Sequence, residues 1–70
     1  GREADIRPVR KDRSGGACTI GDTNYSQPWT RDLVSMITSV GCQSILFNDS
    51  TVGAVTYCEN HNNHLHVNFT

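Results

Sequence analysis

The sequence predicts an α+β fold in which one main helix packs against a small, largely antiparallel sheet. Two observations lead to this class. Strand-like segments lie near both ends of the chain, and one amphipathic segment lies between them, so the elements run strand, helix, strand, strand. The chain has 70 residues and is interpreted as one domain at most, residues 1–70. A chain this short buries only roughly 60% of its unfolded surface, so we expect a disulfide, a metal or a partner chain to add stability.

The first third of the chain is expected to contain one strand and one long irregular segment. Residues 4–9 predict a short strand, and Pro8 marks either an edge position or the end of that strand, because proline lacks an N–H group. Residues 10–27 contain two clusters of turn-forming residues, at 14–16 and 21–24, and are predicted to form a loop.

The clearest element is a helix over residues 29–40. Thr30 is the expected N-cap, and Asp32 suits the first turn, where a negative charge is favourable. Gly41 provides the left-handed residue at which helices commonly stop. Helical spacing predicts one apolar face, made of Leu33, Met36, Ile37 and Val40.

The C-terminal part is predicted to supply two strands joined by turns. Residues 43–48 form the first, and the apolar run at 45–47 indicates burial on both faces. Residues 64–69 alternate between apolar and polar and form the terminal strand. Turns are expected at 48–50 and 60–63, while 51–58 is ambiguous, since its β-branched residues favour a strand and Gly53 and Ala54 count against one. The expected core is Leu33, Met36, Ile37, Val40, Ile45, Leu46 and Phe47.

The charge balance excludes some classes of partner. Six Lys and Arg residues face seven Asp and Glu residues, which argues against a nucleic-acid binder with a basic stripe and against an electrostatic membrane anchor. No apolar run approaches the roughly 20 residues of a membrane span. The N-terminal residues lack the apolar stretch of a secretory signal, so the signal of an exported protein would lie outside this sequence.

The three cysteines are Cys18, Cys42 and Cys58. Their spacing matches no zinc knuckle and no redox pair. In so small a chain we expect at least one disulfide and an oxidising compartment, and burial as free thiols is the alternative.

All three histidines lie in the segment His61-Asn62-Asn63-His64-Leu65-His66. In a strand His64 and His66 would share one face, with Leu65 directed to the core, and two imidazoles on one face can converge on a zinc ion. Surface histidines without a ligand are the alternative interpretation. The carboxylates available as further ligands are Glu3, Asp5, Asp12, Asp22, Asp32, Asp49 and Glu59, of which Asp5 stands out because a strand would hold it rigidly.

Two segments resemble the motifs of a family of zinc peptidases. Gly1-Arg2-Glu3-Ala4-Asp5-Ile6 is similar to the end of an H-x-x-G-x-x-x-D motif, and H-N-N-H-L-H-V at 61–67 resembles an H-x-x-H-x-H motif. Together they resemble the peptidases related to penicillin-insensitive murein endopeptidase, within the wider group of D-alanyl-D-alanine carboxypeptidases and phage endolysins. The resemblance extends over nearly the whole chain, including the helix and residues 45–49.

The resemblance implies a function and a role for individual residues. Zn2+ would be the cofactor, with Asp5 and His66 as ligands. His64 would steady the substrate or transition state, and His61 would occupy the position of the general base. The implied reaction is hydrolysis of peptide bonds in peptidoglycan stem peptides or crosslinks by metal-activated water, in the periplasm, outside the cell, or by a phage-encoded enzyme. Apart from the resemblance, we hypothesise that Arg2, Arg7 or Arg10 pairs with a substrate carboxylate.

One zinc ligand of that family has no counterpart here. It is a histidine three residues before the motif glycine, and Gly1 is that glycine. We therefore expect the chain to be the C-terminal part of a larger domain, with the missing ligand supplied by further residues or by a second polypeptide. Two alternatives remain: a non-catalytic peptidoglycan- or metal-binding relative, and a structural zinc domain with four protein ligands.

Overall fold

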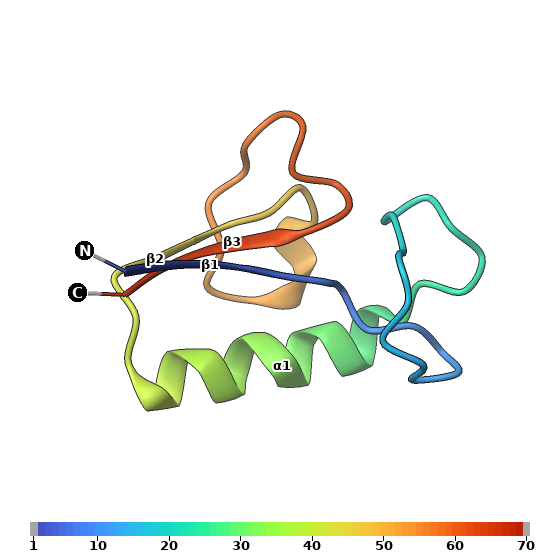
Figure 1. The fold of residues 1–70 in the computed structure, drawn as a ribbon, viewed down its shortest axis with the longest axis horizontal. Coiled ribbons are helices and arrows are strands. Elements are labelled where there is room, and N and C mark those ends of the chain that lie inside the picture. Colours follow the sequence, from blue (N-terminus) through green and yellow to red (C-terminus); the bar gives the residue numbers. More distant parts are fainter. Residues whose placement is uncertain (1, 70) are drawn as a thin grey trace.

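The computed structural model describes residues 2–69 and contains one long helix and a three-stranded antiparallel sheet. The elements are β1 (Arg2–Ile6), α1 (Gln27–Val40), β2 (Ser44–Leu46), the 3-10 helix η1 (Ser50–Val52) and β3 (Leu65–Phe69). Figure 1 shows α1 along one face of the sheet, while the segment between η1 and β3 arches over the opposite face. The predicted α+β class is confirmed. Within residues 2–69, no helix has the length and apolar character needed to cross a bilayer.

β3 lies at the centre of the sheet and pairs antiparallel with β1 on one side and β2 on the other. Ala4, Val67 and Ile45 form one row across the three strands, and Val67 and Ile45 in this row are buried beneath α1. Successive side chains of a strand point to opposite faces. The next row, made of Asp5, His66 and Leu46, therefore lies on the face away from α1.

The helix begins earlier than predicted, and its N-cap is Ser26, not Thr30. The Ser26 hydroxyl accepts a hydrogen bond from the Trp29 backbone N–H at 3.2 Å, and Pro28 occupies the first turn, where its missing N–H costs nothing. Thr30 is fully buried, and its hydroxyl accepts a hydrogen bond from the Val9 backbone N–H at 3.0 Å. At the other end Gly41 has a φ of 109° and donates its N–H to the Ile37 carbonyl, so the predicted glycine stop is confirmed.

The face of α1 that is buried differs from the predicted face. The helix buries Thr30, Val34 and Ile37, whereas Met36 and Val40 are 63% and 79% exposed, so their assignment to the core was wrong. The sequence pattern counted only apolar residues and could not anticipate that a hydrogen-bonded threonine would take a core position. The buried core cluster consists of Val34, Ile37, Ile45, Phe47, Val52, Leu65 and Val67, with Leu33 packed at its margin and Leu46 half-buried on the polar face.

The strands are shorter than the predicted ranges 4–9, 43–48 and 64–69. β1 ends at Ile6, two residues before Pro8, in agreement with the prediction that Pro8 marks an edge or an end. Residues 51–58 do not form a strand: Asp49 caps η1, Gly53 follows with a φ of 121°, and only Thr56 makes a bridge to Leu46. The backbone turns at Gly53, so residues 51–58 do not continue as the extended strand that their β-branched side chains favour.

The long N-terminal loop is irregular, as predicted, and is tied down at several points. Tyr25 forms a bridge with Arg10 and donates its hydroxyl to Asp49 at 2.7 Å. The three cysteines are free thiols in this structure, where a disulfide was expected. Cys18 is 1% exposed, and burial raises the pKa of its thiol. Cys42 packs against the core, so these two residues act as small apolar side chains.

Replacing Ile45 by valine removes one methylene from the core and is expected to lower the free energy of unfolding by about 0.5–1.5 kcal/mol. The matched control is Val40→Ala on the exposed face of α1, which is expected to change that free energy by less than about 0.5 kcal/mol. Urea unfolding followed by circular dichroism measures both. A larger loss for Val40→Ala than for Ile45→Val would mean that the sequence-predicted helix face is the buried one.

Replacing Ser26 by alanine removes the N-cap acceptor and is expected to cost about 1 kcal/mol of stability. Ser35→Ala, at an exposed position inside the same helix, is expected to be neutral or slightly stabilising, because alanine has the best helix propensity. The same urea titration compares the two variants. Equal stability of both variants would show that Ser26 does not cap the helix.

Candidate functional site

The polar face of the sheet places Asp5 directly opposite His66. These residues are partners in the β1–β3 register although they are 61 residues apart in sequence. His66 Nδ1 lies 2.9 Å from Asp5 Oδ1. Leu65 and Val67 on either side of His66 are fully buried, so the strand carrying the imidazole is anchored in the core. The two residues that the resemblance gives as zinc ligands are therefore in contact.

His66 lies between two carboxylates. Its Nδ1 faces Asp5, and its Nε2 is 3.7 Å from Glu3 Oε1. Glu3 precedes Asp5 by two residues in β1 and shares its face of the sheet. The hydrogen bond with Asp5 is the main reason that the pKa of His66 is raised, burial opposes this effect, and the charge of Glu3 adds to it.

The loop before β3 brings His61 and His64 to the same face. The ring centroids of His61 and His64 are 4.6 Å apart, and those of His61 and His66 are 6.0 Å apart. Figure 1 shows this loop arching over the sheet on the side away from α1. The three histidines that are close in sequence thus form one cluster in space, next to Asp5.

Neighbouring oxygens define how these two rings present their nitrogens. His61 Nδ1 lies 2.9 Å from the Glu59 carbonyl oxygen, and His64 Nδ1 lies 2.8 Å from Asn63 Oδ1. Carbonyl and amide oxygens only accept hydrogen bonds, so these two contacts are hydrogen bonds in the tautomer that carries a proton on Nδ1. In that neutral tautomer, Nε2 of each ring holds the lone pair and can accept a proton.

Asp5 and His66 supply two donors of the kind that zinc binds. Their separation of 2.9 Å is that of a hydrogen bond between Nδ1 and Oδ1. Within residues 2–69, no group of three His, Cys, Asp or Glu side chains is arranged to hold a metal ion. The described residues thus bring together two groups of the types that bind zinc, fewer than the three protein ligands typical of a catalytic zinc site. Gly1, the glycine of the resembled motif, lies outside the described residues.

Two other candidate carboxylates are engaged elsewhere. Asp12 accepts hydrogen bonds from Arg10, which lower the pKa of its carboxyl to about 2. Asp49 caps η1 and accepts hydrogen bonds from Thr51 and Tyr25. Burial raises the pKa of Asp49, but these hydrogen bonds have the larger combined effect, so its pKa is lowered. The hydrogen bonds of Asp12 and Asp49 are therefore made with partners other than the three histidines.

Two residues near the histidines were given no particular role from the sequence. Glu3 was one of seven candidate carboxylates and could have been preferred together with Asp5, because a strand places residues two apart on one face. Asn63, which accepts from His64, has no comparable signal, since a polar residue between two histidines predicts no particular contact.

Comparisons of the chain with protein-family models, with curated proteins and with solved structures gave no match. The resemblance to zinc peptidases therefore rests on the two motifs and on the residues that carry them.

The raised pKa of His66 makes part of the stability of the metal-free chain depend on pH. Because the folded chain binds this proton more tightly than the unfolded chain, the stabilisation is complete below the unfolded pKa of about 6.5 and is lost as the pH rises through the folded value. NMR titration of the imidazole resonances is expected to give a pKa for His66 above about 6.5, and a lower one in Asp5→Asn.

The control for this titration is Asp12→Asn, which removes a carboxylate paired with Arg10 and is expected to leave the His66 pKa unchanged. A His66 pKa that does not respond to Asp5→Asn would contradict the assigned hydrogen bond.

Proposed function

We propose that this chain is part of a zinc-dependent peptidase that hydrolyses peptide bonds of peptidoglycan stem peptides or crosslinks. The observation that carries the proposal is the contact between Asp5 and His66 across β1 and β3. The resemblance names these same two residues as zinc ligands, and they come from opposite ends of the sequence. Their direct opposition supports a shared role, and His61 and His64 lie beside them.

In the metal-free chain a proton bridges His66 and Asp5. The raised pKa of His66 reflects this hydrogen bond. With that proton removed from Nδ1, the imidazole nitrogen and the carboxylate oxygen would be available to hold a zinc ion, since both are groups that bind zinc. Zinc binding by this pair would therefore weaken as the pH falls.

The chemistry of the site divides between the metal and the two remaining histidines. When bound, zinc supplies Lewis-acid chemistry that activates water and polarises a peptide carbonyl near neutral pH. His61, with Nδ1 held by the Glu59 carbonyl, offers Nε2 as a general base that takes a proton from water and passes it to the leaving amine. His64, when protonated at Nε2, donates a hydrogen bond to the oxyanion that forms at the carbonyl.

The proposal requires a third protein ligand from outside the described residues. A catalytic zinc ion typically has three protein ligands and an open position, and Asp5 and His66 provide two. Further residues of the same protein or a second polypeptide would supply the third. The protein would then act in the periplasm or outside the cell, or on the cell wall as a phage-encoded enzyme.

In the protein completed with its third ligand, His66→Ala is expected to lower zinc affinity by at least roughly 100-fold, since loss of a residue that only supports a ligand already costs about 10–100-fold. Hydrolysis of crosslinked peptidoglycan fragments is expected to be lost with the metal. Calorimetric zinc titration and chromatography of the released peptides measure the two effects.

Asp12→Asn is the control, because it alters an exposed carboxylate paired with Arg10. If His66→Ala hydrolyses the fragments as fast as the unsubstituted protein, the proposal is wrong. Zinc binding that depends on Asp5 and His66 without any hydrolysis by the completed protein would instead favour the non-catalytic relative.

A further inference from the structure

Two successive carbonyl groups fasten the histidine loop, residues 58–64, to the rest of the molecule. The Asn48 N–H donates to the His61 carbonyl at 3.0 Å, and the Ile20 N–H donates to the Asn62 carbonyl at 2.9 Å. The two donors come from separate parts of the chain, one just after β2 and the other in the long N-terminal loop. The place of the His61 side chain therefore depends on how these two segments are held.

One hydrogen bond joins the two donor segments directly. The Tyr25 hydroxyl donates to Asp49 Oδ2 at 2.7 Å, and Asp49 is the residue next to Asn48. Tyr25 also lies against the buried ring of Phe47, with the ring centroids 6.4 Å apart. Tyr25 itself belongs to the same N-terminal loop as Ile20. A single side chain thus links both segments that hold the histidine loop.

Two turns connect Ile20 to Tyr25 over a short stretch of sequence. The Asp22 N–H donates to the Thr19 carbonyl at 3.0 Å, and the Tyr25 N–H donates to the Asp22 carbonyl at 3.0 Å. Each bond closes a turn of four residues, so the segment has little freedom to stretch. Ile20 and Tyr25 both pack against the hydrophobic core. A shift of Tyr25 would therefore be passed on to the Ile20 N–H.

Asp49 is the fixed end of this link, because its other carboxylate oxygen caps η1. Asp49 Oδ1 accepts from the Thr51 N–H at 3.0 Å and from the Thr51 hydroxyl. The Gln27 side-chain amide in turn donates to the Thr51 carbonyl at 3.0 Å and to its hydroxyl oxygen at 3.2 Å. Gln27 is the first residue of α1, so Asp49 is tied through η1 to the start of the helix.

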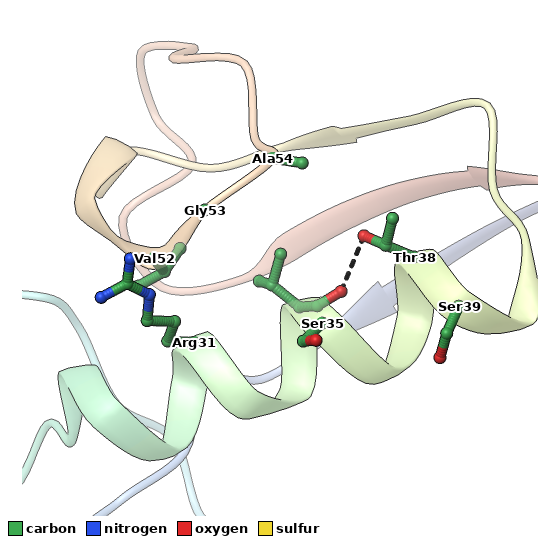
Figure 2. A pocket seen from close by; sticks show the side chains of 8 residues that line it. Arg31, Ser35, Thr38, Ser39, Val52, Gly53 and Ala54 are labelled. Carbon is green, nitrogen blue, oxygen red and sulfur yellow. Dashed lines mark hydrogen bonds between the residues drawn. The ribbon is translucent and has the colours of Figure 1, made fainter.

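Hydrophobic packing also holds η1 against α1. Val52 is 1% exposed and belongs to the same core cluster as Val34 of the helix. Figure 2 shows Val52 and Gly53 on one side of a cavity of about 450 Å³, with Arg31 of α1 on the other side. None of the three histidines lines this cavity. Asp49 is therefore attached to a part of the fold that does not depend on the histidines.

We propose that Tyr25 and Asp49 are positioning residues that set where His61 lies for proton transfer. The inference rests on the proposed peptidase function, in which His61 is the general base. A base must lie within hydrogen-bonding reach of the water that it deprotonates, and a misplacement of about 1 Å can cost on the order of 100-fold in rate. Asp5 and His66 are held by the β1–β3 register instead. Loss of the hydrogen bond between Tyr25 and Asp49 is therefore expected to slow hydrolysis without weakening zinc binding.

The first test is amide hydrogen exchange, measured by NMR on the metal-free chain. Tyr25→Phe keeps the ring and removes only the hydroxyl donor. Exchange at the Ile20 and Asn48 amides is expected to become at least about tenfold faster, the loss typical of a hydrogen bond to a charged group. Tyr57→Phe is the matched control at an exposed tyrosine, and Ile45→Val is a control that lowers overall stability. Neither control is expected to speed exchange at these two amides, because local opening does not require the core to unfold.

The second test is hydrolysis of crosslinked peptidoglycan fragments by the protein completed with its third ligand. Tyr25→Phe is expected to lower kcat by about tenfold or more, while the zinc affinity measured by calorimetry stays unchanged. Asp49→Asn keeps an acceptor for the cap of η1 and loses the charge that the Tyr25 hydroxyl faces. It is expected to change amide exchange and kcat in the same directions by smaller factors, and it replaces Tyr25→Phe if that variant does not fold.

The inference is wrong if Tyr25→Phe leaves exchange at both amides unchanged. It is also wrong if Ile45→Val speeds exchange there by the same factor, since Tyr25 would then contribute only to overall stability. An unchanged kcat, or a fall in zinc affinity that matches the fall in kcat, would overturn it as well. If the completed protein hydrolyses no peptidoglycan at all, the peptidase function fails, whereas the exchange result still decides whether Tyr25 and Asp49 hold the histidine loop.

Discussion

The register between β1 and β3 determines which residues of the two strands face the helix and which face the open side of the sheet. It sets Ala4 beside Val67 on the face covered by α1 and, one residue further on, Asp5 beside His66 on the open face. Since side chains alternate along a strand, a slip of one residue would exchange the two faces. The buried positions Leu65 and Val67 make such a slip costly, so the hydrophobic core indirectly holds the polar pair in contact.

Around this pair, fixed oxygen acceptors give each histidine a different environment. His66 is held between Asp5 and Glu3 and has a raised pKa. His61 faces a backbone carbonyl, and His64 faces a side-chain amide. Three residues of one type, within six positions of sequence, thus acquire three distinct chemical settings. The proposed division between metal binding, proton transfer and charge stabilisation assigns one role to each of these settings.

Periodicity predicted the fold class, since it identified one helix and strands near both ends. It could not predict details that depend on contacts distant in sequence. Thr30 is buried because its hydroxyl accepts a hydrogen bond from the Val9 N–H, and no local sequence pattern predicts this contact. For the candidate site, the motifs identified Asp5 and the histidines, whereas their contact depends on the strand register. The sequence likewise does not distinguish Arg7 from Arg10, and the structure pairs Arg10 with Asp12.

The pairing of β1 with β3 also bears on how the chain folds. These strands lie at opposite ends of the sequence, and Asp5 and His66 are separated by 61 residues, so their contact closes a loop that spans almost the entire molecule. Closing a long loop costs chain entropy, and pairings of such high contact order form slowly. The contact between Asp5 and His66 therefore forms only when β1 and β3 have paired. An ion held by both residues would crosslink the two strands and favour the paired state.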